Sequence, residues 1–121
     1  MGTVSYAGSA VEFSDRVLTH VQIVVVQKFR RNEPFMLSWI IGDSAGHGGR
    51  TSWWLTPSVP ILFNFAGSRV PTVDQEWLVR LAQSADSSRG LIVVDERGVL
   101  IPGTVVATDA GMPRVPRTDR R

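Results

Sequence analysis

The sequence predicts an α+β fold in which an antiparallel or mixed sheet packs with two helices. Two observations support this prediction: apolar residues alternate with polar ones in several short segments, and they recur at helical spacing in two longer ones. The segments follow the order ββαβββαβ, which favours a sheet covered by helices. The length of 121 residues suits one domain, which we place at residues 1–101.

The first part of the chain is predicted to form a hairpin and a helix. Apolar residues alternate with small or polar ones at residues 4–6 and 11–13, on either side of a turn. Residues 15–31 then carry apolar side chains at helical spacing behind Ser14-Asp15, either of which can cap the first turn. The β-branched run at residues 21–26 also suits a strand, so both interpretations of that run stay open here.

The middle of the chain is predicted to form three strands. Residues 35–41 and 59–65 show the alternation of half-buried strands, and residues 52–56 form a short strand between them. Four glycines at residues 42–50 predict an exposed, mobile loop before that short strand.

The last part of the domain is predicted to form a second helix and a final strand. Thr72 and Gln75 have the spacing of a capping box, and residues 77–85 place their apolar side chains on one face before Gly90. Residues 91–94 form a strand that can pair with residues 99–101 across a turn. Glycine, proline and arginine prevail without periodicity from residue 102, which predicts a disordered basic tail at residues 102–121.

Composition limits where the protein works and what it contacts. No apolar run approaches the roughly 18 residues that span a bilayer, so we expect no membrane contact. The chain has no cysteine and no secretory signal at its start, which favours a cytoplasmic location. Residues 1–109 carry nine basic against ten acidic side chains, so the positive charge belongs to the tail.

A second set of apolar residues lies opposite the alternating core positions of the predicted strands: Met36, Ile40, Trp54 and Leu62. Polar residues would suit these positions if that face of the sheet were solvated. Either the second helix covers this face, or a protein partner or a second subunit does, because large exposed apolar patches are uncommon on monomers.

The first helix and the tail offer candidate contacts to nucleic acid. At 100° per residue, one stripe of the helix holds Arg16, His20, Gln27 and Arg31, and the tail holds Arg114, Arg117, Arg120 and Arg121. The stripe also suits an ordinary solvated face, with basic residues at the negative end of the helix dipole. Lys28 lies near the centre of the apolar face, where its stem can be buried while its amine reaches solvent or an acid.

No motif of catalysis or of cofactor binding is recognisable. Residues 42–52 depart from a phosphate-binding loop, because Ser44 replaces its first glycine and an arginine replaces its lysine. The absence of cysteine and the distant spacing of the two histidines disfavour zinc, and no nucleophile elbow occurs. We therefore predict no catalytic, cofactor or metal residues.

Several stretches together resemble a family of small actinobacterial proteins of unknown function that are often labelled ATP-dependent DNA ligase: residues 5–8, 13–20, 27–31, 35–39, 54–60 and 77–90. The resemblance spans about residues 2–97. A ligase attacks the α-phosphate of ATP with the lysine of a Lys-x-Asp-Gly motif. The only lysine here stands in Lys28-Phe29-Arg30-Arg31, so the resemblance implies a family and assigns no adenylylation site.

Three functional hypotheses follow. The leading one is a non-enzymatic interaction module that binds a protein partner or itself through the apolar face of Met36, Ile40, Trp54 and Leu62. The second is a nucleic-acid-binding accessory protein that uses the basic stripe and the tail. The third is a ligase-related activity, as the family label says.

Overall fold

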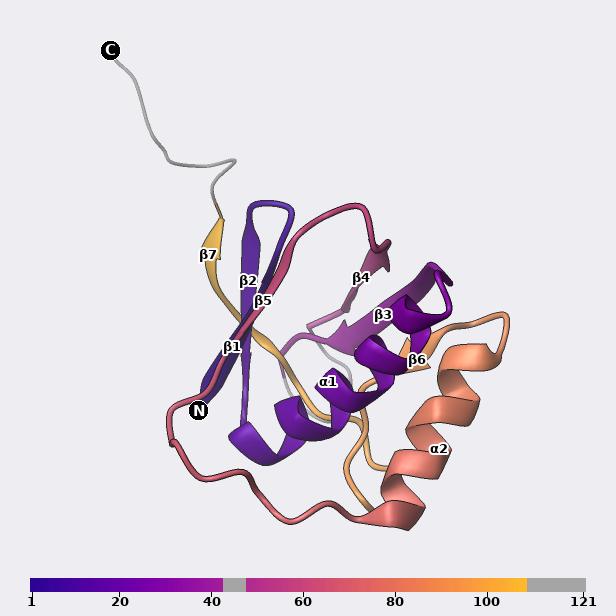
Figure 1. Cartoon of the computed structure of the whole chain (residues 1–121). Helices are drawn as coiled ribbons and strands as arrows, with labels where there is room; N and C mark the ends of the chain where they lie inside the picture. Colours follow the sequence, from indigo (N-terminus) through magenta and orange to yellow (C-terminus); the bar gives the residue numbers. More distant parts are fainter. Residues whose placement is uncertain (43–47, 109–121) are drawn as a thin grey trace.

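The protein folds into two sheets and two helices, seen here in a computed structural model that describes residues 1–42 and 48–108 (Figure 1). The elements, in chain order, are β1 (Gly2–Tyr6), β2 (Ser9–Phe13), α1 (Asp15–Arg30), β3 (Phe35–Ile40), β4 (Arg50–Leu55), β5 (Ile61–Asn64), α2 (Gln75–Asp86), β6 (Leu91–Ile92) and β7 (Thr104–Thr108). The predicted α+β class is confirmed, and the helical interpretation of residues 21–26 is correct.

The strands form two separate sheets. The four-stranded sheet has the order β5-β1-β2-β7 and is antiparallel throughout. The three-stranded sheet has the order β4-β3-β6, with β4 antiparallel and β6 parallel to β3. The chain enters the three-stranded sheet after α1 and returns at β5, so residues that are close in sequence can lie on different sheets.

The core lies between the two sheets and the helices. Figure 1 shows α1 between the four-stranded sheet and α2, with β3 and β6 beside both helices. The inward side chains of β1, β2 and β3 and the apolar stripe of α1 form one continuous cluster, to which α2 adds Trp77, Leu81 and Ala85. Side-chain alternation in the strands and the helical period of α1 place these residues on the inward side.

The two helices begin at different kinds of cap. Ser14 caps α1 by accepting a 3.2 Å hydrogen bond from the Val17 backbone N–H. The capping box predicted at Thr72 is wrong, because Asp74 is the N-cap of α2 and its carboxylate accepts from the Trp77 backbone N–H at 3.1 Å. Both Asp and Thr can cap a helix, so local sequence alone left this choice open.

The predicted tail begins too early. Residues 104–108 form β7, which pairs with β2 along the edge of the four-stranded sheet. The run Thr-Val-Val-Ala-Thr is rich in β-branched residues, which suit a strand even after Pro102 and Gly103. Residues 109–121, which include Arg114, Arg117, Arg120 and Arg121, lie outside the described residues.

The last predicted strand pair is present as a single bridge. Val94 pairs with Leu100 in antiparallel fashion, and the turn between them is closed by the Asp95 backbone N–H, which donates to the Val99 carbonyl at 2.8 Å.

Neither helix in the described part of the chain is long and apolar enough to cross a membrane.

Candidate interaction surface

Two of the four predicted interface residues form an exposed apolar pair. Met36 on β3 lies directly opposite Trp54 on β4 in the register of the three-stranded sheet. The Met36 side chain is 38% exposed and the Trp54 side chain 60%. A large aromatic residue exposed beside a second apolar side chain is the feature expected of a binding surface.

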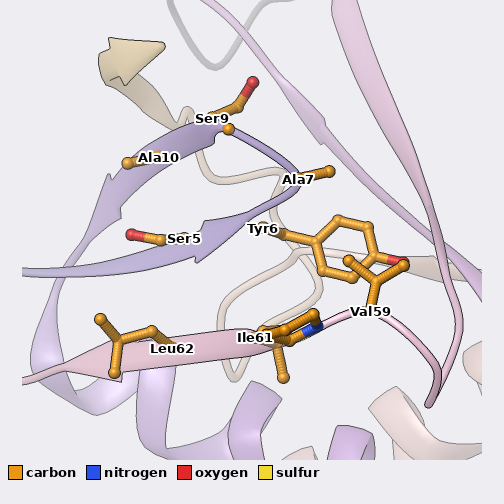
Figure 2. Close-up of a pocket in the computed structure, with 10 residues that line it drawn as sticks. Ser5, Tyr6, Ala7, Ser9, Ala10, Val59, Ile61 and Leu62 are labelled. Carbon is orange, nitrogen blue, oxygen red and sulfur yellow. The ribbon is translucent and has the colours of Figure 1, made fainter. Parts of the chain in front are cut away.

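The other two predicted residues are placed differently from this exposed pair. Ile40 is only 8% exposed, and the segment at Pro102 pairs beside it. Leu62 is 55% exposed but lies on β5, opposite Ser5 in the four-stranded sheet. There it borders a hollow of about 570 Å³ at the β1–β2 hairpin (Figure 2). Leu62 is therefore separated from the other three predicted residues, which lie on the three-stranded sheet.

Helix α2 does not cover the Met36–Trp54 pair. Its buried residues Trp77 and Leu81 join the core cluster, which also contains the inward residues Phe35 and Leu37 of β3. Met36 is the residue between these two, so its side chain points to the other face of the sheet. That face, defined by Met36, Ser38, Ile40, Arg50, Ser52, Trp54 and Ile92, is called the open face below.

The open face contains a cavity of about 420 Å³ that is lined by apolar side chains, serines and two arginines. Met36, Ile40, Ile92 and Leu100 supply the apolar lining, and Arg50 and Arg89 supply the guanidinium groups. The hydroxyls of Ser38 and Ser52 lie 2.7 Å apart and hydrogen-bond to each other across β3 and β4. Such a surface can bury apolar groups while its arginines contact aromatic rings or acidic groups.

Sequence reasoning missed much of this lining. Ser38, Arg50 and Ser52 share the two-residue period of Met36 and Trp54, so the strand alternation contained a signal for them. Arg89 and Leu100 come from loops outside the strands, and no local pattern indicates that they reach this face.

Tyr6 fixes the end of β4 that carries Trp54. Its hydroxyl donates to the Trp54 carbonyl and accepts from the Thr56 backbone N–H, both at 3.0 Å. Its ring also lies 5.7 Å from that of Trp53. The hairpin of the four-stranded sheet therefore holds the edge of the three-stranded sheet in place, which orients the exposed Trp54.

The predicted basic stripe of α1 is interrupted in the structure. Arg16 forms a 2.8 Å salt bridge with Glu96, and its guanidinium lies 5.4 Å from the centre of the Trp77 ring. Arg31 lies 3.3 Å from Glu33, and Gln27 is exposed. Both arginines already have an acidic neighbour, which lowers the positive potential that a phosphate backbone would meet.

His20 is buried, contrary to its predicted place on a solvated stripe. Its Nε2 accepts from the Asp74 backbone N–H at 2.9 Å, so its Nδ1 carries the proton and donates to the Arg16 carbonyl at 2.8 Å. The ring also stacks on Trp77 at 4.0 Å. His20 thus joins α1 to the first turn of α2, because α2 packs over this side of α1.

Lys28 is buried at the end of α1 and forms salt bridges with two acids. Its Nζ lies 2.5 Å from Asp86 and 3.3 Å from Glu33. The hydrogen bond to Asp86, with a smaller contribution from Glu33, raises the pKa of Lys28 above its ordinary value of 10.5. A protonated amine has no lone pair with which to attack a phosphate, so these contacts favour a structural role for Lys28.

The described residues contain no group of three or more histidine, aspartate or glutamate side chains that could hold a metal ion.

The predicted loop between β3 and β4 includes residues 43–47, which lie outside the described part of the chain. The segment that departs from a phosphate-binding loop leads from strand to strand, as predicted, because β4 begins at Arg50.

Comparison with known proteins gives one relationship. Residues 1–96 match the model of a domain of unknown function, DUF7882. Searches of curated proteins and of solved structures found no match. The matched region contains both helices and the strands from β1 to β6, including Met36 and Trp54, whereas β7 follows it. Because the match spans more than half of the chain, the protein belongs to the DUF7882 family.

Proposed function

We propose that the protein is an interaction module that acts through binding rather than catalysis, and that its open face docks on a second copy of the chain. The observation that carries the proposal is the exposed Met36–Trp54 pair beside the cavity of the open face. Burial of a tryptophan and of a neighbouring methionine is a large part of the binding energy in many protein interfaces.

A second copy suits this face because the face is complementary to itself. Arg50, Ser52 and Trp54 alternate along β4, so their side chains share the open face. A two-fold axis over Ser52 sets Arg50 of one copy opposite Trp54 of the other. That arrangement gives two equal cation–π contacts, which are strongest over tryptophan and when water is excluded. Such a contact uses the same patch on both copies, so the assembly stops at two chains, as in most homodimers.

Size-exclusion chromatography with light scattering, over a series of protein concentrations, tests this proposal. The wild-type chain should dimerise as the concentration rises, and Trp54→Asp should stay monomeric because it places a carboxylate in the apolar contact. Leu62→Asp is the matched control, since Leu62 is 55% exposed on the other sheet, close to the 60% of Trp54, and it should dimerise like the wild type. A monomeric wild type, or a dimer that survives Trp54→Asp, would contradict the proposal.

The other two hypotheses remain predictions with weaker support. Support for nucleic-acid binding is weaker because the basic stripe of α1 is not continuous. His20 is buried, and Arg16 contacts Glu96. A ligase-like reaction requires an unprotonated lysine, whereas Lys28 contacts two carboxylates.

A further inference from the structure

A second groove lies between α1 and the edge strand β5, away from the open face. Its wider part is a cavity of about 390 Å³ whose apolar wall is formed by Val25, Val26 and Phe29 of α1 and by Ile61 and Phe63 of β5. Val26 is 40% exposed, although it lies on the side of α1 that faces this cavity. The surface therefore has an apolar lining that the described chain leaves uncovered.

The groove continues along α1 into a smaller cavity of about 100 Å³. Gln22 lines both cavities, and the smaller one is bordered by Thr19, Phe65 and residues 67–71. From Thr19 to Arg30 the helix is roughly 16 Å long, at 1.5 Å per residue. A fully extended peptide of about five residues has the same length.

The strand that borders the groove has one side available for pairing. In the four-stranded sheet, β5 pairs with β1 and is the outermost strand on that side among the described residues. An edge strand presents backbone N–H and C=O groups that can pair with an added strand. A groove between a helix and an edge strand is the geometry in which extended peptides bind by strand addition, with pockets for alternate side chains.

Charge indicates the chemistry of the peptide. Arg30 lies at one end of the groove and Arg69 at the other. Neither arginine forms a salt bridge within the part of the chain that the structure describes. A peptide with an apolar, β-branched centre and an acidic group at each end is complementary to this arrangement.

The same charges disfavour two other occupants. The end of this chain, residues 110–121, carries four arginines and one aspartate, and it follows β7 at the opposite edge of the sheet from β5. A second copy that paired its β5 with this one in antiparallel fashion would bring the Arg30 end of one groove to the Arg69 end of the other. Both arrangements place like charges together.

We infer that the groove between α1 and β5 binds an extended peptide, apolar at its centre and acidic at its ends, that adds a strand to β5. This site is separate from the open face and does not depend on self-association. The peptide contacts Val26 and Phe63 through alternate side chains, and its acidic ends lie beside Arg30 and Arg69.

Selection from a displayed library of random heptapeptides against the full chain tests the inference. Enriched peptides should alternate β-branched or aromatic residues with others, and acidic residues should flank them. Val26→Glu places a charge in the groove and should weaken their binding at least tenfold. Val79→Glu is the matched control, because Val79 is 52% exposed on α2, and it should bind like the wild type.

Nuclear magnetic resonance with an enriched peptide locates the contact. Amide shifts should move in β5 and along α1 from Gln22 to Arg30, and amide exchange in β5 should slow. Trp54→Asp should bind the peptide as the wild type does, so a failure of the dimer proposal would leave this result unaffected. An absence of enriched peptides, binding that survives Val26→Glu, or shifts confined to the open face would overturn the inference.

Discussion

Gly103 occupies a position where no side chain fits. A Cβ atom there would lie 2.6 Å from Cδ1 of Trp39, 2.8 Å from Cζ of Phe13 and 2.8 Å from Cγ2 of Val11. Trp39 is fully buried and packs edge-on against Phe13 and Trp53. The ring of Trp39 therefore lies against the backbone of the segment that leads into β7.

Gly103→Ala should lower the free energy of unfolding by about 1–3 kcal/mol, because overpacking forces the neighbouring core side chains to move. Gly67→Ala is the control, since a Cβ there meets only Oδ2 of Asp15 at 3.6 Å, and its effect should stay within about 0.5 kcal/mol. Urea denaturation measures both. Equal stability of Gly103→Ala and the wild type would show that this part of the core can relax.

At the scale of elements, Asp15 joins the start of α1 to the segment after β5. Its two carboxylate oxygens accept from the backbone N–H groups of Ala66 at 3.1 Å and of Gly67 at 2.9 Å. The hydrogen bond from Gly67, followed by that from Ala66, lowers the pKa of Asp15 below its ordinary value of 3.8. Ser14 caps the helix, so Asp15 is available for this second contact.

Asp15→Asn should reduce stability at neutral pH and have less effect in acid. A carboxylate whose pKa is lowered by folding stabilises the fold above its ordinary pKa, and this contribution is lost as the pH falls through the lowered value. The difference in urea midpoint between wild type and variant should therefore be largest at pH 7 and shrink below about pH 4. A difference that is independent of pH would contradict this role of the ionised group.

The pKa of Asp86 is also lowered, chiefly by its hydrogen bond from Lys28, and that of Asp95 is lowered by backbone hydrogen bonds from Val99 and Arg97. All three carboxylates change stability in the same direction, so the wild-type protein should itself be less stable below about pH 4. Lys28 has the opposite pH dependence, because a pKa that folding raises adds stability that is lost only as the pH rises into the alkaline range.

At the scale of the whole molecule, β7 closes one edge of the four-stranded sheet although it follows the region matched by the family. It pairs with β2 through the register Val11 with Val105 and Glu12 with Thr104. The Gly103 backbone N–H also donates to the Ile40 carbonyl at 2.9 Å, which ties the segment before β7 to the three-stranded sheet. The two sheets therefore share this segment.

Removal of residues 104–121 should lower the urea midpoint, because β2 loses its partner and becomes an exposed edge. A chain that ends after Thr108 is the control, since it keeps all of β7. Denaturation followed by circular dichroism and tryptophan fluorescence compares the two chains. If they unfolded at the same urea concentration, β7 would not contribute to the stability of the domain.

The candidate site could be predicted only in part from the sequence. Met36 and Trp54 were found because strand alternation assigns them to the face opposite the core, and the register then places them together. Leu62 satisfied the same rule but lies on the other sheet. The groove between α1 and β5 was not predicted, since it joins two elements that are separated in the sequence by residues 31–60.

The sequence by itself determined the helices, most of the strands and the position of the first turn, because periodicity, caps and turn residues act within a few positions of the chain. Only the tertiary structure decided that the strands divide into two sheets, that α2 buries His20 and leaves Trp54 exposed, and that Lys28 meets Asp86. These outcomes depend on packing between distant segments. The same local pattern can serve a covered face or an open one, and only the position of the remaining chain decides between them.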